Sequence, residues 1–500
     1  MRAESKTRSA IVRCALASRC TKIARVTSRW LRRGISAAGV IGSVADCGSR
    51  TGVGLDEATP VTVLDASAGG HPADATTRVA DARSSRPPDA AARDVEAGTP
   101  PSTDAGRFFT CPSEIPAGAP FAMLGNCSTR DGRARVAGPT SPHVTWTASA
   151  PSALSNGGFV AADSSGGVYI ADTILMGNAL VPTFGRIDGT SGALDWSTSL
   201  PSSTVASLSP FLNPMDTLVD FANDATGPIL EVFSPSTGAT VPTTLPSSLS
   251  GIGIPAVGAD GSLYVEYVPV TGPQTKKGLV SRVLPDHTIA WTSEDLSVGP
   301  ATFGGFLTLA LGEHDEVIVV TTDTSGVLSR VYELSPMTGA TLWSTDIPAQ
   351  LMGGAAVGPD GSVAVIASEN GSDYSLLYIL EPTGAIRATA SVGGQTIVAI
   401  GADGTILVDG LTAVSSAGAT LWIKNAGGLG VQIDSDGTII ATSTGEIVGL
   451  DSATGEKRWS LDASDVPGFG RHCASIQSAT LTSNGGLVGI GCNILFGASD

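Results

Sequence analysis

The sequence is poor in charge, in aromatic rings and in the motifs that most enzymes use for chemistry. Charged residues make up 15% of the 500 positions, aromatic residues 5%, and there are five histidines. It contains no Cys-x-x-Cys, no Gly-x-Ser-x-Gly, no His-Glu-x-x-His and no phosphate-cradling glycine loop. These absences remove the familiar zinc, redox and hydrolase motifs. No catalytic residue, cofactor-binding residue or metal ligand is therefore predicted.

Basic residues are scarce beyond the start of the chain. Residues 1–46 hold ten of the 29 Lys and Arg residues but only two of the 46 acidic ones. The remainder carries 19 basic and 44 acidic residues. Such a negative surface repels phosphate backbones, so we expect no nucleic-acid partner.

The apolar run that follows the basic start is short. Arg29, Arg32 and Arg33 precede the run 35–45, which ends just before Cys47. A basic stretch followed by about 7–15 apolar residues is typical of an export signal, whereas a membrane-spanning helix needs about 20. We therefore expect residues 1–46 to be a signal or leader segment.

The residues just before Cys47, Val-Ala-Asp, resemble a bacterial lipobox. This resemblance implies a lipid anchor on Cys47, with a simple cleaved secretory signal as the alternative. Gly48 and Ser49 lack the Asp that keeps enteric lipoproteins at the inner membrane. The expected location is the outer membrane of a bacterial envelope, on its periplasmic or outer side, and the alternative is secretion.

Four of the seven cysteines fall as two local pairs, Cys111/Cys127 and Cys473/Cys492. In an oxidising compartment each pair would close a small loop. Four cysteines allow three connectivities, and four buried free thiols are the alternative.

The chain divides by composition into four parts. After the leader, residues 47–108 are rich in Ala, Asp and Pro with little aliphatic content, which predicts a disordered tether. Residues 109–140 form a transitional segment that contains two cysteines. Residues 141–500 carry an internal repeat.

One copy of the repeat is complete, in residues 445–459. The pattern predicts a strand that ends at Leu450, a turn from Asp451 to Gly455, and a second strand that carries Trp459. Asp, Ser and Thr side chains can bond the backbone of such a turn, and Gly455 can take the positive φ that closes it.

The same turn and ring position recur along the chain. The aligned positions, 34 to 52 residues apart, are Trp196, Pro242, Trp291, Trp343, Ala388, Trp422 and Trp459. A second turn, Asp-Gly between β-branched runs, lies within several intervals, at Asp260, Asp360, Asp403 and Asp436. Two hairpins give four strands, which is one blade of a β-propeller.

The two ends of the repeat region complement each other. The last unit, from about Ser478, has three strands and then stops before any tryptophan. The missing strand is available near Val144, where Trp146 stands 50 residues before Trp196, in step with the repeat. We predict an all-β, eight-bladed β-propeller closed by its N-terminal strand, or seven blades if residues 201–249 are not a blade.

The motif Asp451-Ser-Ala-Thr-Gly455-Glu-Lys-Arg-Trp459 resembles the tryptophan-docking repeat of PQQ-type (quinoprotein-like) β-propellers. The resemblance covers about 145–500, and only this copy is complete. It implies that the rings pack between neighbouring blades as structural docking residues. These rings are Trp146, Trp196, Trp291, Trp343, Trp422 and Trp459.

That family contains both enzymes and scaffolds. Its alcohol dehydrogenases bind pyrroloquinoline quinone and a metal, often beside a Cys-Cys pair that this sequence lacks. The other branch contains lipid-anchored scaffolds of the BamB type. We therefore expect a monomeric, non-catalytic envelope lipoprotein without cofactor that binds a protein partner. A PQQ-dependent dehydrogenase-like enzyme and a surface carbohydrate-binding module are the alternatives.

Two acidic clusters contain enough ionisable side chains to be considered as metal sites. Glu313-His314-Asp315-Glu316 is the densest ionisable group, and it stands where other units have Asp-Gly. Asp434-Ser-Asp436-Gly lacks the later ligands of an EF-hand loop. Both are predicted to be hairpin turns.

Overall fold

The computed structural model describes residues 132–500 apart from short gaps, and all of them belong to the compact unit Phe108–Asp500. The gaps are residues 153, 155–157, 177–178, 202–204, 207–209, 214–215, 225–226, 250–254, 259, 268–277, 299–302, 307–308, 324, 326, 369–374, 394–396, 409–411, 425–428, 444 and 470–474. The leader, the tether, Cys47, Cys111, Cys127 and Cys473 lie outside the described residues. What the sequence predicts for them stays a prediction.

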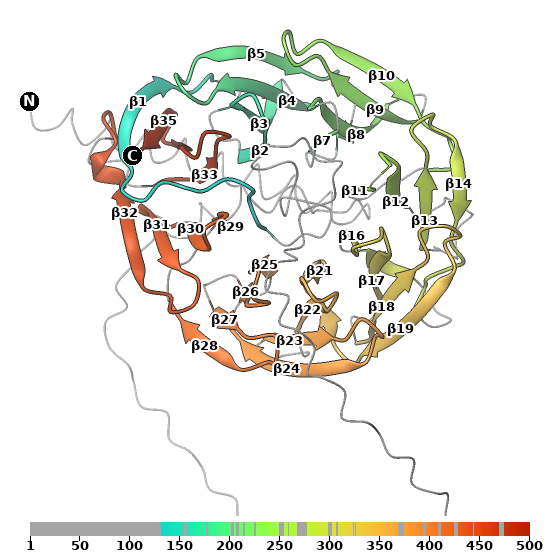
Figure 1. The fold of residues 1–500 in the computed structure, drawn as a ribbon. Helices are drawn as coiled ribbons and strands as arrows, with labels where there is room; N and C mark the ends of the chain where they lie inside the picture. Colours follow the sequence, from blue (N-terminus) through green and yellow to red (C-terminus); the bar gives the residue numbers. More distant parts are fainter. Residues whose placement is uncertain are drawn as a thin grey trace, which may run out of the picture. The chain divides into compact units, whose positions relative to one another are not determined.

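The described strands form eight antiparallel sheets that stand as blades around a ring (Figure 1). Blades 1 and 2 contain β2 (Gly158–Ala162), β3 (Gly167–Met176), β4 (Ala179–Asp188), β5 (Leu194–Ser199), and then β6 (Val205–Ala206), β7 (Phe211–Leu212), β8 (Leu218–Asp224), β9 (Gly227–Phe233) and β10 (Thr240–Thr244). Blades 3 and 4 contain β11 (Ala256–Val257), β12 (Leu263–Tyr267), β13 (Leu279–Val283), β14 (Ile289–Thr292), and then β15 (Phe303–Phe306), β16 (Ala310–Leu311), β17 (Val317–Asp323), β18 (Ser329–Leu334) and β19 (Thr341–Ile347).

The second half of the ring repeats the arrangement. Blades 5 and 6 contain β20 (Gln350–Leu351), β21 (Ala356–Val357), β22 (Val363–Ser368), β23 (Ser375–Leu380), β24 (Ile386–Val392), and then β25 (Ile397–Ile400), β26 (Ile406–Val408), β27 (Thr412–Val414) and β28 (Thr420–Ile423). Blades 7 and 8 contain β29 (Leu429–Ile433), β30 (Thr438–Thr442), β31 (Glu446–Asp451), β32 (Lys457–Asp462), and then β33 (Ser478–Leu481), β34 (Leu487–Gly491), β35 (Ile494–Ser499) and β1 (His143–Ser149). A single-turn 3₁₀ helix, η2 (Ala463–Asp465), follows β32.

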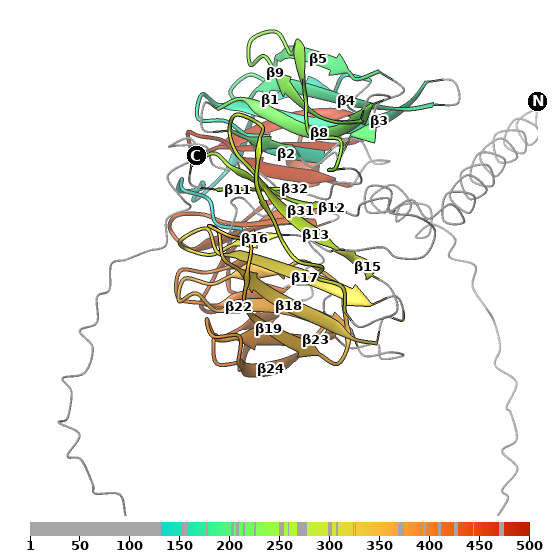
Figure 2. The ribbon, with the colours of Figure 1, turned by 90° about the vertical axis from the view of Figure 1, so that its right-hand side faces the viewer.

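The prediction of an eight-bladed propeller is confirmed. Residues 205–244 form a complete blade, which excludes the seven-bladed alternative. In blades 2, 4 and 5 the inner strand is broken into two short pieces that both pair with the second strand. Figure 2 shows the ring from its edge, where blades 3 to 5 lie one after another.

The position of a strand within its blade determines its residue pattern. Second strands lie between two neighbouring blades, so β12, β30 and β34 are buried at every residue and are almost continuously apolar. The outermost strand β1 instead alternates between exposed and half-buried residues. This difference in burial explains why the middle of each blade is an aliphatic run whereas its outer strand is rich in Ser and Thr.

The core consists of eight hydrophobic clusters, one at each junction between neighbouring blades. At the junction of blades 1 and 2, for example, the ring centres of Phe184 and Phe233 lie 4.9 Å apart. Each blade therefore depends on both neighbours for its burial, and closing the ring buries the last pair of faces.

The predicted closure by an N-terminal strand is also confirmed. β1 pairs antiparallel with β35, from His143 opposite Ser499 to Ser149 opposite Ile494. Beyond this ladder, Asp500 Oδ1 accepts hydrogen bonds from the backbone N–H groups of Ser141 (2.7 Å) and Thr140 (2.9 Å). Blade 8 is thus assembled from both ends of the described chain.

The residues before β1 contact the centre of the ring. The N–H of Ala134 donates to the carbonyl of Ile433 (2.6 Å), and the N–H of Ile433 donates to the carbonyl of Gly132 (3.0 Å). These bonds make a short parallel pairing with the inner strand β29. The segment then crosses outward, where the N–H of Gly138 donates to Asp434 (2.9 Å), before it reaches β1 at the rim (Figure 1).

Candidate functional site

One face of the ring collects two kinds of tight turn from each blade. In an antiparallel meander the first and third connections lie at the same end. We call the connection between the inner and second strands the inner turn, and the connection between the third and outer strands the docking turn. The face that carries both is the turn face.

In blades 3, 5 and 6 the inner turns are built from Asp-Gly pairs. In blade 3, Asp260 Oδ1 accepts the N–H of Ser262 (2.8 Å), and Gly261 has φ of +78°. Asp360 and Asp403 accept the N–H two residues later in the same way, at 3.0 Å each. A carboxylate that bonds the backbone and a glycine with positive φ together fix a rigid turn.

The docking turns use the same chemistry. In blade 7, Asp451 Oδ1 accepts the N–H groups of Ala453 (3.0 Å) and Thr454 (2.9 Å), and Gly455 has φ of +67°. Hydrogen bonds from Arg458 and from Thr454 lower the pKa of Asp451 to about 2. The predicted turn residues therefore form a turn whose carboxylate is ionised over almost the whole pH range.

Most docking tryptophans lie against the glycine of the next blade's docking turn. A methyl group added to that glycine would lie within 2.8 Å of the indole. The pairs are Trp146 with Gly192, Trp196 with Gly238, Trp291 with Gly339, Trp343 with Gly384 and Trp422 with Gly455. Three of these indoles also donate their N–H to a carbonyl in that turn, Trp196 to Pro235 (2.9 Å), Trp291 to Pro336 (2.8 Å) and Trp422 to Ser452 (3.0 Å).

Trp459 differs because the docking turn of blade 8 is split between the chain ends. It is 8% exposed and packs in the cluster between blades 7 and 8. Its Nε1 has no hydrogen-bond partner among the described residues. Asp500 takes the place of the turn's first residue, and Thr140 and Ser141 take the places of Thr190 and Ser191 in blade 1.

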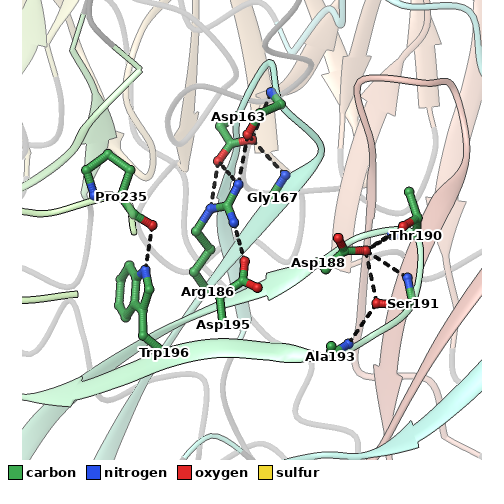
Figure 3. Close-up of polar contacts among 11 residues, drawn as sticks. Asp163, Gly167, Arg186, Asp188, Thr190, Ser191, Ala193, Asp195, Trp196 and Pro235 are labelled. Atoms are coloured by element: carbon green, nitrogen blue, oxygen red, sulfur yellow. Dashed lines mark hydrogen bonds and ion pairs between the residues drawn. The ribbon is translucent and has the colours of Figure 1, made fainter. Parts of the chain in front are cut away.

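Arginine side chains fasten the inner turns of blades 1 and 3, and Figure 3 shows the one in blade 1. The guanidinium of Arg186 donates to Asp163 (2.8 and 2.9 Å) and forms an ion pair with Asp195. It lies 5.8 Å from the ring centre of Tyr169. Burial raises the pKa of Tyr169, and the Asp163 carboxylate raises it further.

Blade 3 repeats this arrangement. Arg282 donates to Asp260 (2.5 Å), and its other Nη donates to the carbonyl of Pro336 in the next blade (3.0 Å). It lies 5.8 Å from the ring centre of Tyr264. The guanidinium therefore joins an inner turn to the following docking turn.

A cavity of about 330 Å³ opens on the turn face between blades 4 and 5. It is lined by Gly312, Glu313, His314, Glu316, Ile318, Glu333, Val357, Pro359, Asp360, Gly361 and Pro382. The segment 312–316 is the inner turn of blade 4, so the prediction that the Glu-His-Asp-Glu cluster forms a turn is confirmed.

Glu333 is the central polar group of the cavity. Its Oε2 accepts the indole N–H of Trp343 (2.7 Å), which therefore does not use a docking-turn carbonyl as Trp196 and Trp291 do. Burial raises the pKa of Glu333, the bond from Trp343 lowers it, and the Glu316 carboxylate raises it. Asp360, across the cavity, is paired with Arg387 (2.7 Å).

The cysteines and the histidines add no further site within the described residues. Cys492 lies in the tight turn after β34 with φ of +52°, and its predicted partner Cys473 is outside the described residues. His143 and His287 lie on the surface in separate blades. Within the described ranges no group of three or more His, Cys, Asp or Glu side chains is placed to hold a metal ion.

Sequence reasoning missed the cavity and the arginine sites. Glu333 was not singled out, and neither were Arg186 and Arg282. Aligning the third strands of the repeat would have revealed them, because the residue opposite the docking ring is Arg in blades 1 and 3 and Glu in blade 4.

Comparison with known proteins agrees with the repeat. Residues 327–468, in blades 4 to 7, match the family model described as outer membrane protein assembly factor BamB. Together with the eight blades, six of which carry a docking tryptophan, this match supports a PQQ-type β-propeller repeat. No curated protein matched the chain.

Solved structures with a similar fold include both branches of these propellers. BamB from Moraxella catarrhalis has 15% identity and a TM-score of 0.38, over 66% of this chain and 94% of that chain. A quinohemoprotein alcohol dehydrogenase from Pseudomonas putida HK5 has 10% identity and a TM-score of 0.49, over 78% and 83%. A europium-containing methanol dehydrogenase has 10% identity and a TM-score of 0.46, over 77% and 98%. At this level the similarities carry no inference about activity.

Among the described residues no helix is long and apolar enough to cross a bilayer. The membrane attachment that the sequence predicts would depend on Cys47, which lies outside them.

Proposed function

We propose that this protein is a non-catalytic scaffold of the bacterial envelope that binds a protein partner through its turn face. The observation that carries the proposal is the construction of that face. Its turns are held by carboxylate–backbone bonds, by positive-φ glycines and by arginine pairs. Loops fixed in this way are suited to recognition, because little conformational entropy is lost on binding.

The charge of the turn face favours a partner with a basic surface. Asp260 and Asp360 are paired with arginines, but Asp403 and Asp436 of the inner turns form no ion pair among the described residues, and blade 4 adds three more carboxylates at positions 313, 315 and 316. Complementary charge raises association rates and excludes acidic partners. The match of blades 4 to 7 to the BamB family model supports a scaffold role in the envelope, with Cys47 as the proposed lipid attachment.

In-cell photo-cross-linking tests this proposal. Benzoylphenylalanine is placed at Met337, which is 74% exposed in the docking turn of blade 4, and, as the control, at Val327, which is 54% exposed in the hairpin at the opposite end of the same blade. We expect one defined protein cross-linked through Met337 and none through Val327. Recovery of the protein alone from both positions would count against the scaffold.

The two alternatives give different results in separate assays. Dye reduction with alcohols or sugars by the purified protein in the presence of PQQ and Ca²⁺ would replace the scaffold with a dehydrogenase. Saturable binding to glycans, without a cross-linked protein, would replace it with a carbohydrate-binding module.

A further inference from the structure

The cavity between blades 4 and 5 occupies the place that an arginine fills elsewhere in the ring. On the third strand, the residue opposite the docking tryptophan is Arg186 in blade 1 and Arg282 in blade 3. In blade 4 the same ladder position is Glu333, opposite Trp343. The charge at this position is therefore reversed in blade 4.

Blade 4 also lacks the tyrosine ring on which the arginine lies in blades 1 and 3. The second-strand residue paired with an alanine of the inner strand is Tyr169 in blade 1 and Tyr264 in blade 3. The equivalent in blade 4 is Ile318, which lines the cavity. Blade 4 therefore lacks both the phenol ring and the guanidinium that occupy this place in blades 1 and 3.

The cavity has acceptors at two positions that correspond to acceptors of Arg282 in blade 3. Arg282 bonds a carboxylate of its inner turn and the carbonyl of Pro336, the second residue of the next docking turn. Around the cavity Glu316 stands at the position of Ser262, which also accepts a hydrogen bond from Arg282 (3.1 Å), and Pro382 is the second residue of the docking turn of blade 5.

Glu316 and Glu333 form no ion pair with a Lys or Arg of the described residues. Glu316 Oε2 accepts only the N–H of His314 (2.9 Å), and Glu333 Oε2 accepts only the indole N–H of Trp343. Two partly enclosed carboxylates without a counter-charge are costly, and a cation that enters the cavity would remove that cost.

We propose that this cavity receives an arginine side chain of the protein partner, held between Glu316 and Glu333. The inference rests on the proposed function for the existence of a partner, but the chemistry of the pocket is independent of it. Arginine fits better than lysine because its planar guanidinium can donate to carboxylates and a carbonyl in several directions at once. In blade 1 the carboxylates are neutralised by Arg186 of the same chain (Figure 3). In blade 4 the partner's arginine would take that role.

The indole N–H of Trp343 provides a direct readout, because it donates to Glu333. The purified full-length protein is titrated with N-acetyl-arginine amide, and the Trp343 indole resonance, assigned with a Trp343→Phe variant, is followed by NMR. We expect a saturable shift with arginine, weaker binding of the lysine analogue, and no shift with the neutral citrulline analogue. An equal shift with citrulline, or no shift with arginine, would overturn the proposal.

Three variants test the residues. Glu333→Gln keeps an acceptor for Trp343 but removes the charge, and it should weaken binding about 10- to 100-fold, as expected for one charge-assisted hydrogen bond. Glu333→Arg restores the blade 3 pattern, so it should abolish binding and raise the melting temperature. Glu456→Gln makes the same charge change at an exposed residue of another blade's docking turn and should leave binding unchanged. Undiminished binding to Glu333→Gln would refute the assignment.

The variants also separate this inference from the proposed function. If Glu333→Arg loses the protein cross-linked through Met337 while its fold is intact by circular dichroism, the cavity is part of the interface. If the partner is captured as efficiently as by the wild type, the inference is wrong and the scaffold proposal stands. If the wild type captures no partner, the scaffold proposal fails, and the NMR titration alone decides whether the cavity binds arginine.

Discussion

The docking indoles make a sharp prediction because two of them, both nearly buried, differ in a single interaction. Trp196 and Trp459 are 6% and 8% exposed. The N–H of Trp196 donates to Pro235, whereas the N–H of Trp459 has no partner among the described residues. Replacing each by Phe keeps most of the aromatic packing and removes only the N–H.

The expected magnitudes follow from that difference. Trp196→Phe should cost about 1 kcal/mol in the free energy of unfolding, the net worth of one hydrogen bond, with a small added packing loss. Trp459→Phe should be close to neutral, because it removes a buried donor that the protein does not satisfy. Trp196→Ala should cost about 3–5 kcal/mol, because it also removes the ring that stacks at 6.0 Å on Phe233.

Urea unfolding followed by far-ultraviolet circular dichroism gives the comparison, with Gly238→Ala as a second probe of the Trp196 site. A methyl group at Gly238 would lie 2.4 Å from the indole, and the residue has φ of +66°. In the Trp196→Ala background only the backbone strain remains, so Gly238→Ala should cost less there than in the wild type. Equal losses for Trp196→Phe and Trp459→Phe, or a Gly238→Ala cost independent of the ring, would refute the docking role.

Three further predictions concern the charged turns. In the Asp451→Asn variant the melting temperature should fall less between pH 4 and pH 2 than it does in the wild type, because the pKa of Asp451 is depressed to about 2. Its stabilising contribution is complete above the ordinary Asp pKa near 4 and is lost as the pH falls towards 2. Asp500→Ala should lower stability by about 1 kcal/mol, measured by thermal melting at pH 7, because the N–H groups of Thr140 and Ser141 lose their acceptor. Arg282→Gln should cost about 1.5 kcal/mol by urea unfolding, a moderate value because Asp260 is half exposed.

Each of these three has a contradicting outcome. If the melting temperature of Asp451→Asn falls at acid pH as much as that of the wild type, the pairing of Asp451 with Arg458 does not determine the acid dependence of stability. A melting temperature unaffected by Asp500→Ala would show that the bonds of Asp500 to Thr140 and Ser141 do not stabilise the ring. A loss for Arg282→Gln no larger than that for Lys457→Gln, whose ion pair lies on an outer strand, would remove the special role of the guanidinium.

The fold could be predicted from sequence because its determinants are local. An Asp-Gly pair, or Asp451 followed by Gly455 and Trp459, marks a turn within a dozen residues, and repetition turns weak local evidence into a count of blades. Even the closing strand was visible, since Trp146 keeps the spacing of the repeat. What could not be predicted are the contacts whose partners are far apart, such as Asp500 with Thr140, 360 residues away.

The candidate site was hidden for a different reason. The cavity lies where blade 4 differs from blades 1 and 3, which have an arginine at the position of Glu333 and a tyrosine at the position of Ile318. Neither residue matches a catalytic or metal motif, and an aliphatic residue in a strand attracts no attention by itself. Only the ladder register, which shows that Ile318 and Tyr264 are equivalent, makes the difference visible.

The pairing of residues 132–134 with β29 stands between the upstream chain and the ladder of β1. A pull from the upstream chain reaches the bonds between Gly132, Ala134 and Ile433 first, and it reaches the ladder of β1 with β35 only after they break. Those few hydrogen bonds at the centre of the ring would break before any strand of a blade is pulled out. Tension on the predicted tether would therefore free the segment ahead of β1 while all eight blades remain closed.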